Sequence, residues 1–148
     1  MKLKIYIDTS VIGGYFDEEF EKETKLFFNN VYETGTMLFV SNLLELELIN
    51  APSFIRDFFL SIPEKNIIKI ESTEEAQELA QKYINEKIVG KTSLLDCQHI
   101  ATATLNNADV LVSWNFKHIV NLMRIKGYNS INLRQGHHTL EIRTPKEI

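Results

Sequence analysis

Short apolar runs alternate with longer stretches of helical periodicity along the whole chain. Runs rich in β-branched and aromatic residues have the length of strands, and runs with apolar residues three and four positions apart have the pattern of amphipathic helices. Alternation of the two predicts an α/β fold with a mainly parallel sheet. The five predicted strands cover residues 3–7, 37–40, 67–70, 110–112 and 130–133.

The helices between these strands are predicted from their apolar periodicity and from their start and stop signals. Ser41 is a candidate N-cap, Ser72 with Glu75 has the spacing of a capping box, and Thr92 or Ser93 is expected to begin another helix. Gly35 and Gly127 are expected to end helices. The predicted helices cover residues 10–16, 18–33, 42–50, 54–61, 72–87, 93–107 and 116–126, and one more extended piece is expected at 140–143.

Length and composition are those of a globular domain. The 148 residues, of which 44% are hydrophobic, suit one domain that spans residues 1–148. No apolar run approaches the roughly 20 residues of a membrane span, and the N-terminus lacks the pattern of a signal peptide. The single cysteine, Cys97, permits no intramolecular disulfide and is expected to be a small core residue. We therefore expect a cytoplasmic protein.

Charge is distributed unevenly along the chain. The net charge is −4, but residues 113–148 hold six Lys and Arg against two Glu, so the rest of the chain is strongly acidic. A basic segment of this kind is typical of a protein that meets an anionic substrate locally, and it is equally typical of an ordinary basic tail. Within this segment, Lys117 is our candidate for a contact with the substrate.

Three polar side chains are expected at the carboxyl edge of the sheet or beside it, where open α/β sheets bind their ligands. Asp8 follows the first strand directly, and Asn115 follows the strand at 110–112. Asp96 lies in the first turn of a helix and shares a face with His99. The competing interpretation is that Asp8, Asp96 and Asn115 are helix caps and His99 a core residue. Asp109 precedes its strand and is therefore expected in a turn at the opposite edge.

The helix at 42–50 offers a further carboxylate, from either Glu45 or Glu47. These two residues lie about 200° apart on a helical wheel and cannot share a face. Glu47 has more apolar neighbours at helical spacing, which favours it as the inward residue. The alternative is that both glutamates are ordinary surface residues.

Carboxylates from three separate elements would repel one another if they met at one edge of the sheet. A divalent cation would make such a cluster stable, because Mg²⁺ and Mn²⁺ prefer oxygen ligands. An ion held in this way can activate water and stabilise the leaving oxygen of a phosphodiester. Asp8, Asp96 and Glu47 are therefore our candidate metal ligands.

Four stretches of the sequence together resemble the PIN-domain family. They are Tyr6–Ile12, the segment from Ser41 to Leu48, Leu95–Ala103 and Ala108–Phe116, and they occur in the family's order. The closest resemblance is to VapC-like members, the toxins of type II toxin–antitoxin pairs. It implies a three-layer α/β/α sandwich with a parallel five-stranded sheet and Mg²⁺- or Mn²⁺-dependent ribonuclease activity.

The resemblance also implies roles for individual residues. Asp8 and Asp96 match metal ligands, Glu47 matches the family's helix glutamate, and Ser113 matches a nearby Ser or Thr that we expect near the substrate. Asn115 stands where the family has a further catalytic aspartate, and an amide weakens the expected hold on a metal. The resemblance further implies an RNA substrate, an antitoxin partner and a homodimer.

Two alternatives to a nuclease remain open at the level of the sequence. Asn115 and the net negative charge allow a catalytically weak or inactive PIN-like module that binds RNA or a protein. An aspartyl-phosphate phosphatase would also begin with an aspartate after the first strand. Such an enzyme has a second aspartate two residues later, where this chain has Ser10.

Overall fold

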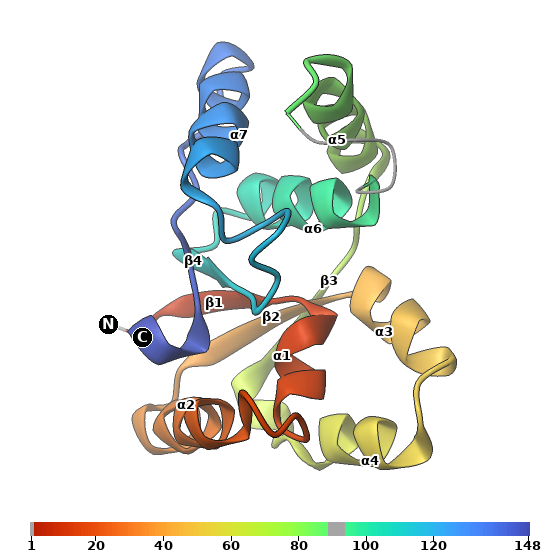
Figure 1. Ribbon diagram of the computed structural model, residues 1–148, viewed down its shortest axis with the longest axis vertical. Coiled ribbons are helices and arrows are strands. Elements are labelled where there is room, and N and C mark those ends of the chain that lie inside the picture. Colours follow the sequence, from red (N-terminus) through yellow and green to blue (C-terminus); the bar gives the residue numbers. More distant parts are fainter. Residues whose placement is uncertain (1, 89–93) are drawn as a thin grey trace.

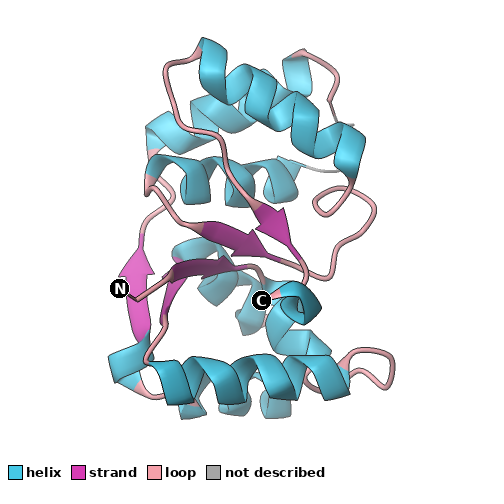
Figure 2. Cartoon of the chain, turned by 90° about the vertical axis from the view of Figure 1, so that its left-hand side faces the viewer, coloured by secondary structure: helices cyan, strands magenta, loops and turns pink. Residues whose placement is uncertain are grey.

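A five-stranded sheet lies between two layers of helices in the computed structural model of the protein (Figures 1 and 2). The structure describes residues 2–88 and 94–148. None of the helices in these ranges is long and apolar enough to cross a membrane.

All strand pairs in the sheet are parallel, in the order β3-β2-β1-β4-β5. This arrangement confirms the α/β fold with a parallel five-stranded sheet. The strands are β1 (Lys4–Ile7), β2 (Met37–Ser41), β3 (Ile67–Ile70), β4 (Val110–Val112) and β5 (Ile142–Arg143).

Helices cover both faces of the sheet, so the strands are almost continuously apolar. On β1, Tyr6 points to the face covered by α5, α6 and α7, whereas Ile5 and Ile7 point to the face covered by α1, α2, α3 and α4. The α-helices are α1 (Thr9–Gly14), α2 (Glu21–Thr34), α3 (Asn42–Ile49), α4 (Ser53–Ser61), α5 (Glu74–Asn85), α6 (Leu94–Leu105) and α7 (Leu122–Arg134).

The fifth strand was predicted in the wrong place. Residues 130–133 belong to α7, which buries Tyr128, Ile131 and Asn132 at helical spacing, and β5 forms instead in the tail, where Ile142 pairs with Leu111. Gly127 does not end a helix, because it lies inside α7. A Cβ atom there would come within 2.6 Å of Ile88, so this glycine permits close packing.

The helix predicted at 116–126 begins only at Leu122, because residues 116–120 form turns and bends. The remaining elements lie close to the predicted ranges, with differences at the caps. Gly35 ends α2 in the left-handed conformation, with φ of 69°, as expected. Thr73, and not Ser72, is the N-cap of α5, since its hydroxyl accepts a hydrogen bond from the backbone N–H of Ala76. The caps predicted at Thr92 and Ser93 lie outside the described residues.

The order of the strands creates a switch point between β1 and β4. The chain leaves β1 toward the helices of one face and leaves the neighbouring β4 toward α7 on the other face. Connections that part in this way open a crevice at the carboxyl ends of the two strands, where α/β proteins bind their ligands. Asp8 and the segment 113–118 are the first residues beyond those strand ends.

Candidate active site

Asp8 is held at the switch point by two serine hydroxyls. Ser10 Oγ donates to Asp8 Oδ1 over 2.5 Å, and Ser113 Oγ donates to Asp8 Oδ2 over 2.7 Å. Asp8 occupies the N-cap position of α1, but its side chain makes no capping hydrogen bond, and the residue is only 4% exposed. The capping interpretation therefore does not account for this carboxylate.

The direction of these two hydrogen bonds is set by the backbone after β4. The N–H of Trp114 donates to Ser10 Oγ over 2.9 Å, and the N–H of Asn115 donates to Ser113 Oγ over 2.9 Å. Each hydroxyl oxygen accepts from the backbone and each hydroxyl proton is directed to Asp8. The segment after β4 thus orients the carboxylate that follows β1.

Asp96 enters the site from the first turn of α6 and is half-buried. Asn115 Nδ2 donates to Asp96 Oδ2 over 3.2 Å. The amide oxygen of Asn115 accepts the backbone N–H groups of Lys117 and His118, over 3.2 and 3.0 Å. With both lone pairs of that oxygen engaged, Asn115 has no acceptor left for a metal, and its amide group orients Asp96.

Glu47 is the inward glutamate of α3, as the wheel analysis favoured. Its Oε1 accepts hydrogen bonds from Thr9 Oγ1 over 2.6 Å and from His99 Nε2 over 2.8 Å. Glu45 lies on the other side of the helix, where it forms a surface ion pair with Lys69. His99 is buried as expected for a core residue, but it also contacts the site through Glu47.

Burial and mutual repulsion shape the protonation of the two aspartates. Burial raises the pKa of Asp8, and the negative charge of Asp96 raises it further, although His99 and the two serines act in the opposite direction. Burial also raises the pKa of Asp96, with a contribution from the charge of Glu47 against the lowering effects of His118, His99 and Asn115. The three carboxylates therefore interact electrostatically.

Glu47 behaves differently from the two aspartates. Burial on its own would raise the pKa of Glu47, but the hydrogen bonds from His99 and Thr9 outweigh that effect, so the pKa is lowered. Glu47 is consequently the carboxylate that holds its negative charge most readily.

Lys and Arg side chains do not neutralise this cluster in the part of the chain that the structure describes. Within residues 2–88 and 94–148, no Lys or Arg forms an ion pair with any of the three carboxylates. No three Asp, Glu, His or Cys side chains in the same ranges lie close enough to bind a metal by themselves. The donor atoms suit Mg²⁺ or Mn²⁺ chemically, and Mg²⁺ usually keeps several of its own water ligands, so a set of few direct ligands is compatible with such an ion.

The two residues expected to contact substrate lie in different environments. Lys117 is exposed in the turn that follows Asn115. Ser113 is fully buried, so it has no surface to offer a substrate in this conformation, and its hydroxyl is used on Asp8. Sequence reasoning assigned no role to Thr9 and Ser10, although two hydroxyl residues directly after Asp8 were a visible signal.

Trp114 packs inside the protein and does not line the site. Its ring stacks on Phe20 with centroids 4.3 Å apart, and its Nε1 donates to Thr24 Oγ1 over 3.0 Å. A Cβ atom on Gly14 would come within 2.7 Å of this indole, so only glycine fits there without a shift.

Comparison with known proteins decides which family this site belongs to. The family model described as PIN domain matches residues 5–117. The chain belongs to the PIN-domain family. A family match over these residues includes Asp8, Glu47, Asp96 and Asn115, and PIN domains are typically nucleases that bind divalent metals.

The fold of this PIN domain is also found in a solved structure, that of VapBC2 from Rickettsia felis bound to a DNA fragment from their promoter. The TM-score is 0.57 at 16% sequence identity, and the match covers 96% of this chain and 98% of the other. At this identity the likeness establishes the fold alone. No curated protein sequence matches the chain significantly.

Proposed function

We propose that this PIN domain is a Mg²⁺- or Mn²⁺-dependent endoribonuclease. The observation that carries the proposal is that Asp8 and Asp96, and Asp96 and Glu47, lie near enough to feel each other's charge at the carboxyl edge of the sheet, with no Lys or Arg paired to them in the described residues. Burial raises the pKa values of the two aspartates and charge repulsion raises them further, and a divalent cation would offset both effects by favouring the charged carboxylates. The aspartyl-phosphate alternative has no support from the family match.

The residues around the carboxylates prepare them to hold an ion directly or through coordinated water. Ser10 and Ser113 orient Asp8, Asn115 orients Asp96, and Glu47 receives both of its hydrogen bonds on Oε1. When bound, the ion would activate a water molecule and stabilise the leaving oxygen of a phosphodiester. Lys117, exposed next to the site, is proposed to contact a phosphate of the RNA.

We further propose that the chain acts as one cytoplasmic domain and as the toxin of a toxin–antitoxin pair. Both ends of the chain contribute to the same sheet, with β1 near the start and β5 near the end. The likeness to a chain of VapBC2 over nearly its full length supports an antitoxin partner. Dimer formation by this chain remains a prediction from the resemblance.

Cleavage of RNA by the purified protein tests the nuclease proposal. RNA would be incubated with the wild type in Mn²⁺ and in EDTA, beside Asp8→Asn and the matched control Asp109→Asn, whose aspartate lies at the opposite edge of the sheet. We expect cleavage only in Mn²⁺, retained in Asp109→Asn and reduced at least about 100-fold in Asp8→Asn. Equal cleavage by wild type and Asp8→Asn would indicate contamination and reject the proposal.

One observation favours the second candidate, a PIN domain that binds RNA or a protein without cleaving it. Asn115 donates a hydrogen bond to Asp96, which partly satisfies in the metal-free protein a carboxylate that would otherwise need a cation. Calorimetric titration with Mn²⁺ separates the two candidates. Absence of Mn²⁺ binding, together with retained RNA binding, would favour the binding module.

A further inference from the structure

We propose that His99 is a positioning residue, which holds Glu47 in its working orientation and is itself oriented by Tyr6 and Ser41 in the protein core. The inference rests on the proposed function, because it holds that these residues orient Glu47, a carboxylate of the proposed metal site.

A continuous chain of hydrogen bonds connects the core to Glu47. Ser41 Oγ lies 2.9 Å from the hydroxyl of Tyr6, and that hydroxyl lies 2.6 Å from His99 Nδ1. His99 Nε2 lies 2.8 Å from Glu47 Oε1. These hydrogen bonds connect the end of β2 through β1 and α6 to α3, so four elements contribute one residue each.

With a neutral imidazole, each proton in these hydrogen bonds has one consistent place. A carboxylate only accepts hydrogen bonds, so His99 Nε2 carries the proton that faces Glu47. In a neutral imidazole Nδ1 is then the acceptor, and the Tyr6 hydroxyl must donate to it. Ser41 in turn donates to the Tyr6 oxygen.

This series of hydrogen bonds runs from the buried core to the edge of the site. Tyr6 and Ser41 are fully buried, His99 is 2% exposed, and the side chain of Glu47 is 30% exposed. Ser41 is the N-cap residue of α3, yet its hydroxyl makes no capping bond and turns to Tyr6 instead. The hydroxyl of Ser41 is thus oriented by its hydrogen bond with Tyr6, and not by the end of α3.

Both bonds to Glu47 fall on the same oxygen. Thr9 and His99 donate to Oε1, and within the described residues Oε2 receives no hydrogen bond. The carboxylate is therefore fixed in rotation while one oxygen stays available for a cation or a water molecule. Residues that orient metal ligands in this way typically contribute about 10- to 100-fold in metal affinity or activity.

The test compares two pairs of variants of the full chain. His99→Leu removes the donor to Glu47, whereas His99→Gln retains an N–H donor on a side chain of similar reach. Tyr6→Phe removes the hydroxyl that orients the imidazole, and Tyr83→Phe is its matched control, because Tyr83 is equally buried but donates to Asn132 outside the site. The readouts are Mn²⁺ affinity by calorimetry, RNA cleavage at saturating Mn²⁺, and the ¹⁵N NMR shifts of the imidazole.

We expect His99→Leu to weaken Mn²⁺ binding about 10- to 100-fold, and His99→Gln to recover part of that loss. Tyr6→Phe should weaken it roughly 2- to 10-fold, and Tyr83→Phe should leave it unchanged. The ¹⁵N shifts should show the proton on Nε2 of His99. If His99→Leu does not fold, the comparison of Tyr6→Phe with Tyr83→Phe and the NMR spectrum still test the role of His99.

Any one of three results would overturn the inference. These are wild-type Mn²⁺ affinity in His99→Leu, equal effects of the two tyrosine variants, and a His99 proton on Nδ1 in place of Nε2. Cleavage that is metal-dependent but independent of His99 would reject the inference alone. Mn²⁺ binding that depends on His99, without any cleavage of RNA, would support the inference and reject the nuclease.

Discussion

The two edges of the sheet carry similar residues in different settings. At the carboxyl edge, Asp8 is buried, bound by two serines and close enough to Asp96 to feel its charge. At the amino edge, Asp109 is exposed and accepts one hydrogen bond, from the backbone N–H of Lys4 over 2.8 Å. Both aspartates adjoin a strand, so position next to a strand does not by itself determine whether a carboxylate is buried near other carboxylates.

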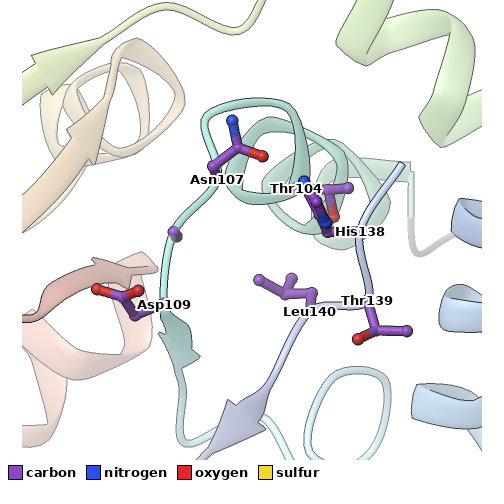
Figure 3. Close-up of a pocket in the computed structure, with 7 residues that line it drawn as sticks. Thr104, Asn107, Asp109, His138, Thr139 and Leu140 are labelled. Carbon is purple, nitrogen blue, oxygen red and sulfur yellow. The ribbon is translucent and has the colours of Figure 1, made fainter. Parts of the chain in front are cut away.

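A cavity of about 280 Å³ lies at the amino edge and is shown in Figure 3. Its lining includes Thr104, Asn107, Asp109, His138, Thr139 and Leu140. These residues come from the end of α6 and from the segment before β5, and Asp109 is the only carboxylate among them. What distinguishes the carboxyl edge is that several carboxylates there feel one another's charge and that burial raises the pKa values of two of them, Asp8 and Asp96.

The largest expected difference between the edges is in metal binding. Asp96→Asn removes a negative charge from the cluster, so we expect it to abolish most of the rise in Tm that Mn²⁺ causes in the wild type. Asp109→Asn removes the same charge at the other edge and should keep the full rise. Thermal unfolding with increasing Mn²⁺ measures the rise in Tm of both variants. An equal rise in Asp96→Asn and Asp109→Asn would contradict the expected difference between the two edges.

The next largest effect concerns packing beside the site. Gly14→Ala places a methyl group against the indole of Trp114, which is stacked on Phe20 and has little room to move. We expect a loss of about 1–3 kcal/mol in the free energy of unfolding. Gly13→Ala is the matched control, because nothing lies within 4 Å of its added Cβ; it should be neutral or stabilising in urea unfolding. A Gly14→Ala variant as stable as Gly13→Ala would contradict the packing.

A smaller effect should appear in the pH dependence of Asp8→Asn. Because the pKa of Asp8 is raised in the folded state, the folded protein holds this proton more tightly than the unfolded chain does. The metal-free wild type therefore loses stability as pH rises from the unfolded value of about 3.9 through the raised folded value. Asp8→Asn has no such proton to lose and should gain about 1 kcal/mol at neutral pH.

Unfolding in EDTA at about pH 4 and about pH 7 checks this expectation. The advantage of Asp8→Asn should be smaller at the lower pH, where more of the wild-type carboxyl is protonated, and larger at the higher pH. An advantage that shrinks as pH rises would mean that Asp8 is stabilised in its charged form, against the burial argument.

The smallest expected change lies at the amino edge. Asn107 follows α6 with a φ of 53°, a conformation that favours glycine. Asn107→Gly should raise the free energy of unfolding by roughly 0.5 kcal/mol. The Mn²⁺ response should not change, because this residue lies away from the carboxylates; a changed response, measured by thermal unfolding, would link the two edges.

Local signals predicted most of the fold, and they failed where a tertiary contact overruled them. β1, β3 and β4 were located from short apolar runs, and α2 was correctly ended at Gly35. Gly127 carried the same stop signal, but α7 continues through it. Its missing side chain instead leaves room for Ile88 to pack closely. Sequence alone does not distinguish a glycine that ends a helix from one that admits a neighbour.

The residues of the site were predictable as types, whereas their partners were not. Asp8, Glu47 and Asp96 could be selected by strand ends and helix faces. The sequence on its own determined an α/β fold and the acidic side chains available to it, because apolar periodicity and residue chemistry are local properties. Only the tertiary structure decided which partners these residues have. Ser113 is buried against Asp8, the amide of Asn115 donates to Asp96, and His99 contacts Glu47. Those contacts join segments separated by tens of residues, and hydrogen bonds depend on distance and direction in space.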